Sequence, residues 1–182
     1  VIEEVEDHVI ERFDYFPTLH LSYQLPGKNQ LMASYSKRID RPRGYYLEPF
    51  LTWMDMYNVR GGNPALEPEY IDAMELGFIN SREKSQFSAE LYYRIKKNKI
   101  ERIKEVYAEG ILLHTVDNVG TDYSLGLETM YNISVAPWWE LNLMGELYDY
   151  RIKSESNGIP YEYQSFNWGT RLNNTFSIAK RV

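Results

Sequence analysis

Three kinds of residue in this sequence could carry chemistry: histidines, regularly spaced glutamates, and aromatic residues concentrated in one segment. The histidines are scattered, at His8, His20 and His114, and none has a partner histidine two or four positions away. An acidic cluster in residues 1–15 lacks the Asp/Gly loop spacing of a calcium site. The chain has no Cys, which excludes thiol catalysis, disulfides and cysteine-bound zinc. We therefore predict no metal site and no cofactor.

Several glutamates recur at positions that a strand would place on its polar side. They are Glu75, Glu90, Glu128, Glu140 and Glu146. Two carboxylates can hydrolyse a glycosidic bond, but here they stand beside basic residues at the same spacing, namely Arg38, Arg94, Lys96 and Arg171. A polar face on which acidic and basic side chains compensate each other explains this pattern more simply than a catalytic pair of carboxylates does. Because no Ser/His/Asp order, phosphate loop or dinucleotide fingerprint is present either, we predict that the chain is not an enzyme.

The segment 41–68 is rich in aromatic residues, which is a poor composition for disorder. It is also far longer than a hairpin loop of about 2–5 residues. Flat apolar faces and hydrogen-bond donors suit a sugar, a peptide or a siderophore, and the predicted ligand-binding residues are Tyr45, Tyr46, Trp53, Tyr57 and Arg60. The alternative is that these aromatics only pack the loop onto its own neighbours, as compact long loops do.

Around this segment, apolar and polar residues alternate with period two, which is the signature of strands. Seven strands are predicted, near residues 16–25, 30–40, 69–79, 86–97, 119–134, 139–152 and 164–176. Short turns near 26–29, 80–85 and 136–138 alternate with long loops at 41–68, 97–117 and 153–163. Within 97–117, residues 100–107 and 111–116 could form a small ribbon around Gly110. The fold class predicted is all-β, an antiparallel meander.

Two architectures produce this alternation: a soluble sheet domain and a membrane-spanning barrel. The long strands, the unequal loop lengths and the aromatics at both strand ends favour the barrel. Phe78, Phe87, Trp138 and Trp139 lie by the short turns, and Tyr35, Tyr93 and Tyr123 lie nearer the long loops. The net charge of −6, without a basic patch, argues against nucleic acid. A soluble antiparallel β domain with a non-catalytic ligand- or protein-binding role remains the alternative.

Several motifs occur in an order that resembles a known family. They are YSKRIDRP at 35–42, GNPALEPEY at 62–70, ELGF at 75–78, NVG at 118–120 with YSLGLE at 123–128, and FPTLHLSY at 16–23. Together they resemble the barrel of TonB-dependent outer-membrane receptors, most closely the outer-membrane protein β-barrel family. The resemblance runs from about Phe16 to Phe176 and so covers almost the whole chain.

The resemblance implies a barrel of about 22 strands, a plug domain inside it, and import of a scarce ligand driven by a TonB-type energy-coupling protein. No plug, coupling box or barrel-closing strand is visible here, so we expect a barrel segment from the C-terminal half of a receptor in the bacterial outer membrane. Its implied partners are membrane lipid, the rest of the receptor, the coupling protein through the plug, and an unnamed small ligand. Unpaired strand edges would also favour self-association of the isolated chain.

Overall fold

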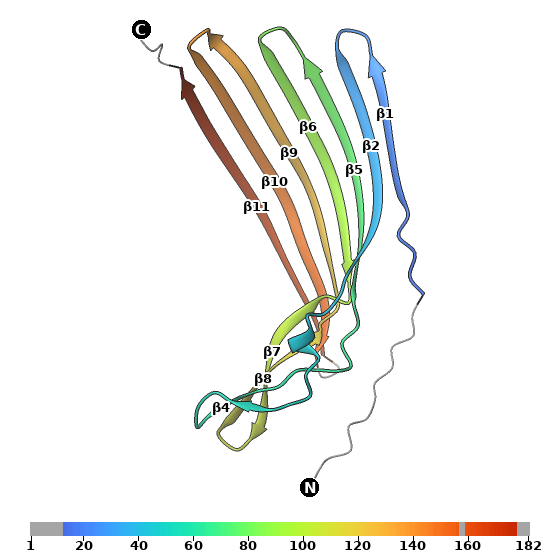
Figure 1. The fold of residues 1–182 in the computed structure, drawn as a ribbon, viewed down its shortest axis with the longest axis vertical. Coiled ribbons are helices and arrows are strands. Elements are labelled where there is room, and N and C mark those ends of the chain that lie inside the picture. Colours follow the sequence, from blue (N-terminus) through green and yellow to red (C-terminus); the bar gives the residue numbers. More distant parts are fainter. Residues whose placement is uncertain (1–12, 157–158, 178–182) are drawn as a thin grey trace.

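The computed structural model describes residues 13–156 and 159–177, most of them in strands (Figure 1). Seven strands form one large antiparallel sheet, here called the wall sheet, in the order β1-β2-β5-β6-β9-β10-β11. They are β1 (Thr18–Leu25), β2 (Asn29–Asp40), β5 (Glu69–Ser81), β6 (Ser85–Lys97), β9 (Thr121–Ala136), β10 (Trp139–Ser156) and β11 (Ile159–Phe176). The predicted seven-stranded antiparallel meander is confirmed. No helix among the described residues is long and apolar enough to cross a membrane.

A second, four-stranded sheet, here called the surface sheet, is made from the two longest connections of the meander. It contains β3 (Thr52–Trp53), β4 (Asn58–Arg60), β7 (Ile100–Ala108) and β8 (Ile111–Asn118), in the order β3-β4-β8-β7. The β4–β8 pairing is parallel, although every pairing in the wall sheet is antiparallel. A short 3₁₀ helix, η1 (Gly44–Tyr46), precedes it. Figure 1 shows the surface sheet at one end of the wall and the β1–β2, β5–β6 and β9–β10 turns at the other.

Two of the three predicted long loops differ from expectation. The segment 41–68 contributes β3, β4 and η1, so it is partly sheet. The prediction of a long loop at 153–163 is wrong: β10 and β11 stay paired through Glu155↔Pro160 and Ser156↔Ile159, and only 157–158 lie outside the described residues. An antiparallel ribbon can have water on its faces, so polar residues do not end it. The predicted ribbon within 97–117 is present as β7 and β8.

Very few side chains are buried, and those that are mostly lie near the surface sheet. Val59, Leu66 and Val116 are buried there, with Val59 at 0% exposure, while Ala73 and Tyr92 are buried in the wall. A single-layer sheet leaves both faces open, so its side chains have nothing of this chain to pack against. The wall therefore needs material on both of its faces that these residues do not supply.

Candidate functional site

The outward face of the wall sheet is a continuous apolar belt. Its middle row, read across paired positions, is Ala33, Leu76, Leu91, Leu127, Leu147 and Trp168. On β11, this face leaves Trp168 at 72% and Phe166 at 68% exposure. The same face ends in Gln164 and Asn174, which are ten residue steps apart. At ~3.3 Å per residue and a tilt of ~40°, these steps span about 25 Å, the height of the apolar band of an outer-membrane barrel.

Aromatic clusters close this belt at the short-turn end. Trp138, Trp139 and Phe176 stack with ring centroids 6.0–6.2 Å apart, and Phe78 lies 6.4 Å from Phe87. Tryptophan and tyrosine favour the boundary between lipid and water because one end of the side chain is apolar and the other is wet. The sequence pattern predicted that Phe78, Phe87, Trp138 and Trp139 lie at this end, and the structure shows which of these rings contact each other.

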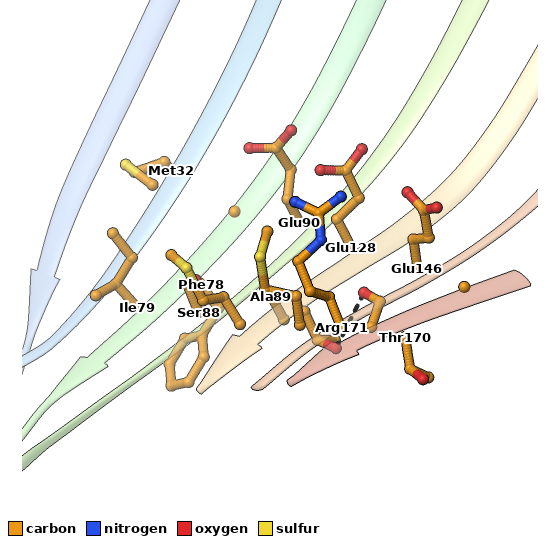
Figure 2. Close-up of a pocket in the computed structure, with 16 residues that line it drawn as sticks. Met32, Phe78, Ile79, Ser88, Ala89, Glu90, Glu128, Glu146, Thr170 and Arg171 are labelled. Atoms are coloured by element: carbon orange, nitrogen blue, oxygen red, sulfur yellow. Dashed lines mark hydrogen bonds between the residues drawn. The ribbon is translucent and has the colours of Figure 1, made fainter. Parts of the chain in front are cut away.

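The opposite, inward face is polar and arranged in layers. Nearest the short turns lies an amide ladder in which Asn173 donates to Asn142 at 3.1 Å and Asn142 to Asn132 at 2.5 Å. The next layers contain Met130 paired with Met144, and then the glutamates. Methionines and glutamates together line a hollow of about 480 Å³, which Figure 2 shows with Met32, the glutamates and Arg171 on one side of the sheet.

Three glutamates form one row across neighbouring strands of this inward face. Glu90 pairs with Glu128, and Glu128 pairs with Glu146. Like charges directly opposite each other in a sheet are destabilising. Arg94 approaches Glu75 at 3.8 Å, but no ion pair to Glu90, Glu128 or Glu146 occurs within the described part of the chain. Among the described residues, the only cation that lines the same hollow is Arg171, which lies beside the row (Figure 2).

A polar junction ties the surface sheet to the wall. The Asn118 side chain accepts from the Glu67 backbone N–H at 2.8 Å and donates to the carbonyls of Glu67 at 2.9 Å and Asn98 at 2.7 Å. Lys99 donates to Tyr150 at 2.6 Å and pairs with Glu101 at 2.8 Å. Burial by itself would lower the pKa of Lys99, but the hydrogen bonds to Glu101 and Tyr150 raise it above its ordinary value.

Beside that junction, Gly120 has a φ of +121°, and a Cβ there would collide with the Lys153 carbonyl. Only glycine adopts this backbone without strain. The backbone between β8 and β9 therefore lies directly against β10 at this point.

The five predicted ligand-binding residues do not form one cluster. Tyr45 and Tyr46 lie together, with ring centroids 4.3 Å apart. Trp53 pairs with Val59, whereas Arg60 is the next residue along β4, so the side chains of Trp53 and Arg60 point to opposite faces of the surface sheet. Tyr57 sits in the β3–β4 turn and is 62% exposed. Ligand contact by these five residues therefore stays a prediction.

Arg102, on β7, was missed by the sequence reasoning. Its guanidinium hydrogen-bonds both phenols of Tyr45 and Tyr46, which raises the pKa of Arg102. The pKa of Tyr45 is lowered by hydrogen bonds, first from Tyr46 and then from Arg102 and Arg43. Alternating basic residues in the predicted ribbon 100–107 were the available signal, but no pattern in the sequence indicated that this ribbon folds against η1.

The histidines do not converge. His114 shares a hydrogen bond with the Asn58 side-chain oxygen at 2.9 Å, and His20 lies on the inward face of β1 beside a hollow that also contacts Glu75 and Glu90. His8 lies outside the described residues. No group of three or more His, Cys, Asp or Glu side chains that could hold a metal ion occurs within 13–156 and 159–177.

An apolar belt of membrane height, a polar inward face and loops gathered at one end define a wall segment of an outer-membrane β-barrel. The model of the outer membrane protein beta-barrel family matches residues 3–182, and the chain belongs to that family. The predicted family and the location in the bacterial outer membrane are confirmed. A search of curated proteins gave no match.

Solved structures with the same fold include siderophore receptors and a copper transporter. The siderophore receptor PirA from Pseudomonas aeruginosa gives a TM-score of 0.65 at 17% identity over 92% of this chain and 37% of its own. A mutant of the ferric enterobactin receptor PfeA from Pseudomonas aeruginosa, in complex with enterobactin, gives a TM-score of 0.61 at 16% identity over 92% of this chain and 33% of its own. The copper transporter OprC gives 0.56 at 12% identity over 91% and 31%. The chain thus spans about a third of each of these structures.

Proposed function

We propose that this chain is part of the barrel wall of a TonB-dependent outer-membrane receptor that imports a small ligand. The observation that carries the proposal is the difference between the two faces of the wall sheet. The outward face is an apolar belt with the height of a bilayer core, and the inward face is lined by amides, methionines and glutamates. Soluble domains rarely expose large apolar patches, whereas here Trp168 is 72% exposed beside other exposed aromatics.

In this proposal the inward face lines the lumen and holds what fills it. The Glu90–Glu128–Glu146 row offers carboxylates without ion-pair partners among the described residues of this chain, in a region shielded from bulk water by the barrel. Charge-assisted hydrogen bonds are about twice as strong as neutral ones. Arginine or lysine side chains of a plug domain would satisfy the row and hold the plug in register with the wall.

The surface sheet and η1 are proposed to lie on the cell exterior and to contact the ligand before import. This places Tyr45, Tyr46, Trp53, Tyr57 and Arg60 at the outer end of the barrel. Support comes from the unequal ends of the wall: its short turns suit the periplasmic side, and longer connections are typical of the extracellular side of such barrels.

Site-directed cysteine labelling tests the topology without background, because the chain has no native Cys. On intact bacteria, a membrane-impermeant maleimide should label Trp53→Cys, whereas Trp138→Cys should react only after the outer membrane is permeabilised. Leu91→Cys should react with a lipophilic reagent, and the adjacent Glu90→Cys should not. Surface labelling at Trp138→Cys, or lipid-side labelling at Glu90→Cys, would contradict the proposed orientation.

Transport itself is tested by uptake of the ligand into cells. Uptake should depend both on the receptor and on the energy-coupling protein, since a barrel that opens by itself would act as a passive pore. Uptake that is unchanged in cells lacking the coupling protein would rule out a TonB-dependent mechanism.

A further inference from the structure

The two faces of the surface sheet carry opposite charges. On one face, Arg60 of β4 is paired with His114 of β8, and His114 is paired with Lys104 of β7. Arg102 lies two residues before Lys104 on β7 and so points to the same face. We call these four residues the basic face. The opposite face carries Glu101 paired with Asp117, and Glu105 in the row of Leu113, Val59 and Trp53.

Arg60, Arg102 and Lys104 of the basic face form no ion pair with the described part of the chain. All three residues are exposed. Arg60 and Lys104 occupy the two positions that flank His114 in this row. By contrast, on the opposite face Glu101 is compensated by Lys99 at 2.8 Å. The basic face therefore retains an uncompensated positive potential.

The side chain of His114 in the middle of this row is held in place. Asp55 accepts from the Asn58 amide at 2.9 Å, and the oxygen of the same Asn58 amide accepts from His114 Nε2 at 2.9 Å. Since the Asn58 oxygen can only accept, Nε2 must carry the proton. This chain of bonds fixes the imidazole between Arg60 and Lys104, with its Nε2–H directed toward the Asn58–Asp55 pair.

Tyrosines border the basic face on its wall side. Two residues after Arg60, a Cβ at Gly62 would meet the backbone carbonyls of Tyr46 and Glu48, so this segment packs directly over the strand end. Arg102 hydrogen-bonds the Tyr45 and Tyr46 phenols. Guanidinium groups, an ammonium group and phenolic hydroxyls thus converge around one surface, and all of them can donate hydrogen bonds to oxygen anions.

We propose that the basic face is a binding site for a soluble ligand that carries several oxyanionic groups, such as carboxylates or catecholates. The inference rests on the proposed function of the surface sheet in ligand contact, and it goes further by assigning the charge class of the ligand. A free metal cation would be repelled by this face, and a neutral sugar could accept its hydrogen bonds but would leave its charges uncompensated. A multiply charged anion would compensate Arg60, Arg102 and Lys104 together.

The test compares two iron(III) complexes of similar size on the detergent-solubilised receptor: the trianionic tris-catecholate and the neutral tris-hydroxamate. The variant removes two cations, Arg60→Gln with Lys104→Gln. Its matched control is Arg82→Gln with Lys84→Gln, which makes the same charge change at the β5–β6 turn, at the opposite end of the wall. Binding is measured by titration at low and high ionic strength.

We expect the R60Q/K104Q receptor to bind the tris-catecholate about tenfold more weakly, since it loses two exposed charge contacts that are each individually weak. The control should bind like the wild type. Raising the salt concentration should weaken wild-type binding more than binding by R60Q/K104Q, because salt screens exposed charges.

Equal affinity of the wild type and R60Q/K104Q for the tris-catecholate would overturn the anion site while leaving ligand contact by the receptor intact. Preference of the wild type for the neutral complex would do the same. Competition by lipopolysaccharide micelles that is lost in R60Q/K104Q would assign the face to lipid phosphate instead and overturn the proposal. Absence of binding by every small probe would count against the proposed function itself.

Discussion

In the wall sheet, leucines at the centre of the strands remain about half exposed, whereas Val59, Leu66 and Val116 at the surface sheet are buried. Both sheets follow the same alternation of apolar and polar residues. The wall spreads its apolar residues over one face of a single layer. The surface sheet instead has η1 and the segment after β4 folded onto it, with backbone bonds from Asn63 N–H to the Tyr46 carbonyl and from Gly62 N–H to the Glu48 carbonyl.

This difference indicates where the stability of each region comes from. The wall has backbone ladders but no internal core, so most of its apolar burial must come from lipid on one face and lumen contents on the other. The surface sheet buries its apolar side chains against its own chain and anchors itself through Asn118 and Lys99. The two regions should therefore respond differently to substitutions and to solvent.

The largest expected effect is that of a charge placed in the middle of the outward belt. Leu127→Arg puts a guanidinium on the lipid-facing side of β9, where Arg or Lys at the bilayer midplane costs about 2–4 kcal/mol. The free energy of unfolding of the receptor in phospholipid vesicles, measured by denaturant titration, should fall by that amount.

The matched control is Met130→Arg, three residues along the same strand but on the inward face, next to Glu128 and Glu146. There the new guanidinium can pair with carboxylates, so the loss should be much smaller. Equal destabilisation by the two substitutions would mean that the faces are not divided between lipid and lumen as described.

This division of faces was predictable from the sequence because a strand has a period of two and a one-residue slip would invert it. Leu91 and Glu90 were assigned to opposite faces from spacing alone. The end of the β10–β11 ribbon was not predictable, because residues 153–163 have the polar composition of a loop whether they are paired or not.

The surface sheet was harder to foresee because it depends on contacts between segments far apart in the sequence. The three-residue β4 pairs with β8 more than fifty positions away in the sequence. No local sequence pattern encodes a parallel pairing between segments so far apart. The separation of Trp53 from Arg60, and the contact of Arg102 with Tyr45 and Tyr46, follow from this pairing. For the same reason the candidate ligand residues lie in one segment of the sequence but not on one face of the surface sheet.

A medium effect is expected where the surface sheet joins the wall. Asn118→Ala removes one accepted and two donated hydrogen bonds to backbone groups of residues 67 and 98, and a hydrogen bond contributes about 0.5–1.5 kcal/mol net. Hydrogen exchange read by mass spectrometry should show faster exchange in residues 58–68 and 97–118, with the wall strands unchanged. Asn174→Ala, which removes only an exposed bond from Trp139, is the control. Uniform loss of protection across the wall would show that the two sheets unfold as one unit.

The smallest effect concerns the exposed β3–β4 turn and its dependence on pH. The Tyr57 backbone N–H and the Asn58 amide donate to Asp55 at 2.7 and 2.9 Å, and these bonds lower the pKa of Asp55 below its ordinary value of 3.8. Because the folded-state pKa is the lower one, the turn gains stability from the ionised carboxylate above the unfolded pKa and loses it as pH falls through the folded value. Amide exchange in residues 54–58, corrected for the intrinsic rate at each pH, should therefore accelerate in strongly acidic solution. Asp55→Asn should exchange faster at neutral pH and lose this acid response, while exchange in β5 and β6 should not change in either protein. An acid response that persists in Asp55→Asn would locate the titrating group elsewhere in the surface sheet and would remove Asp55 as the group that orients Asn58 and, through it, His114.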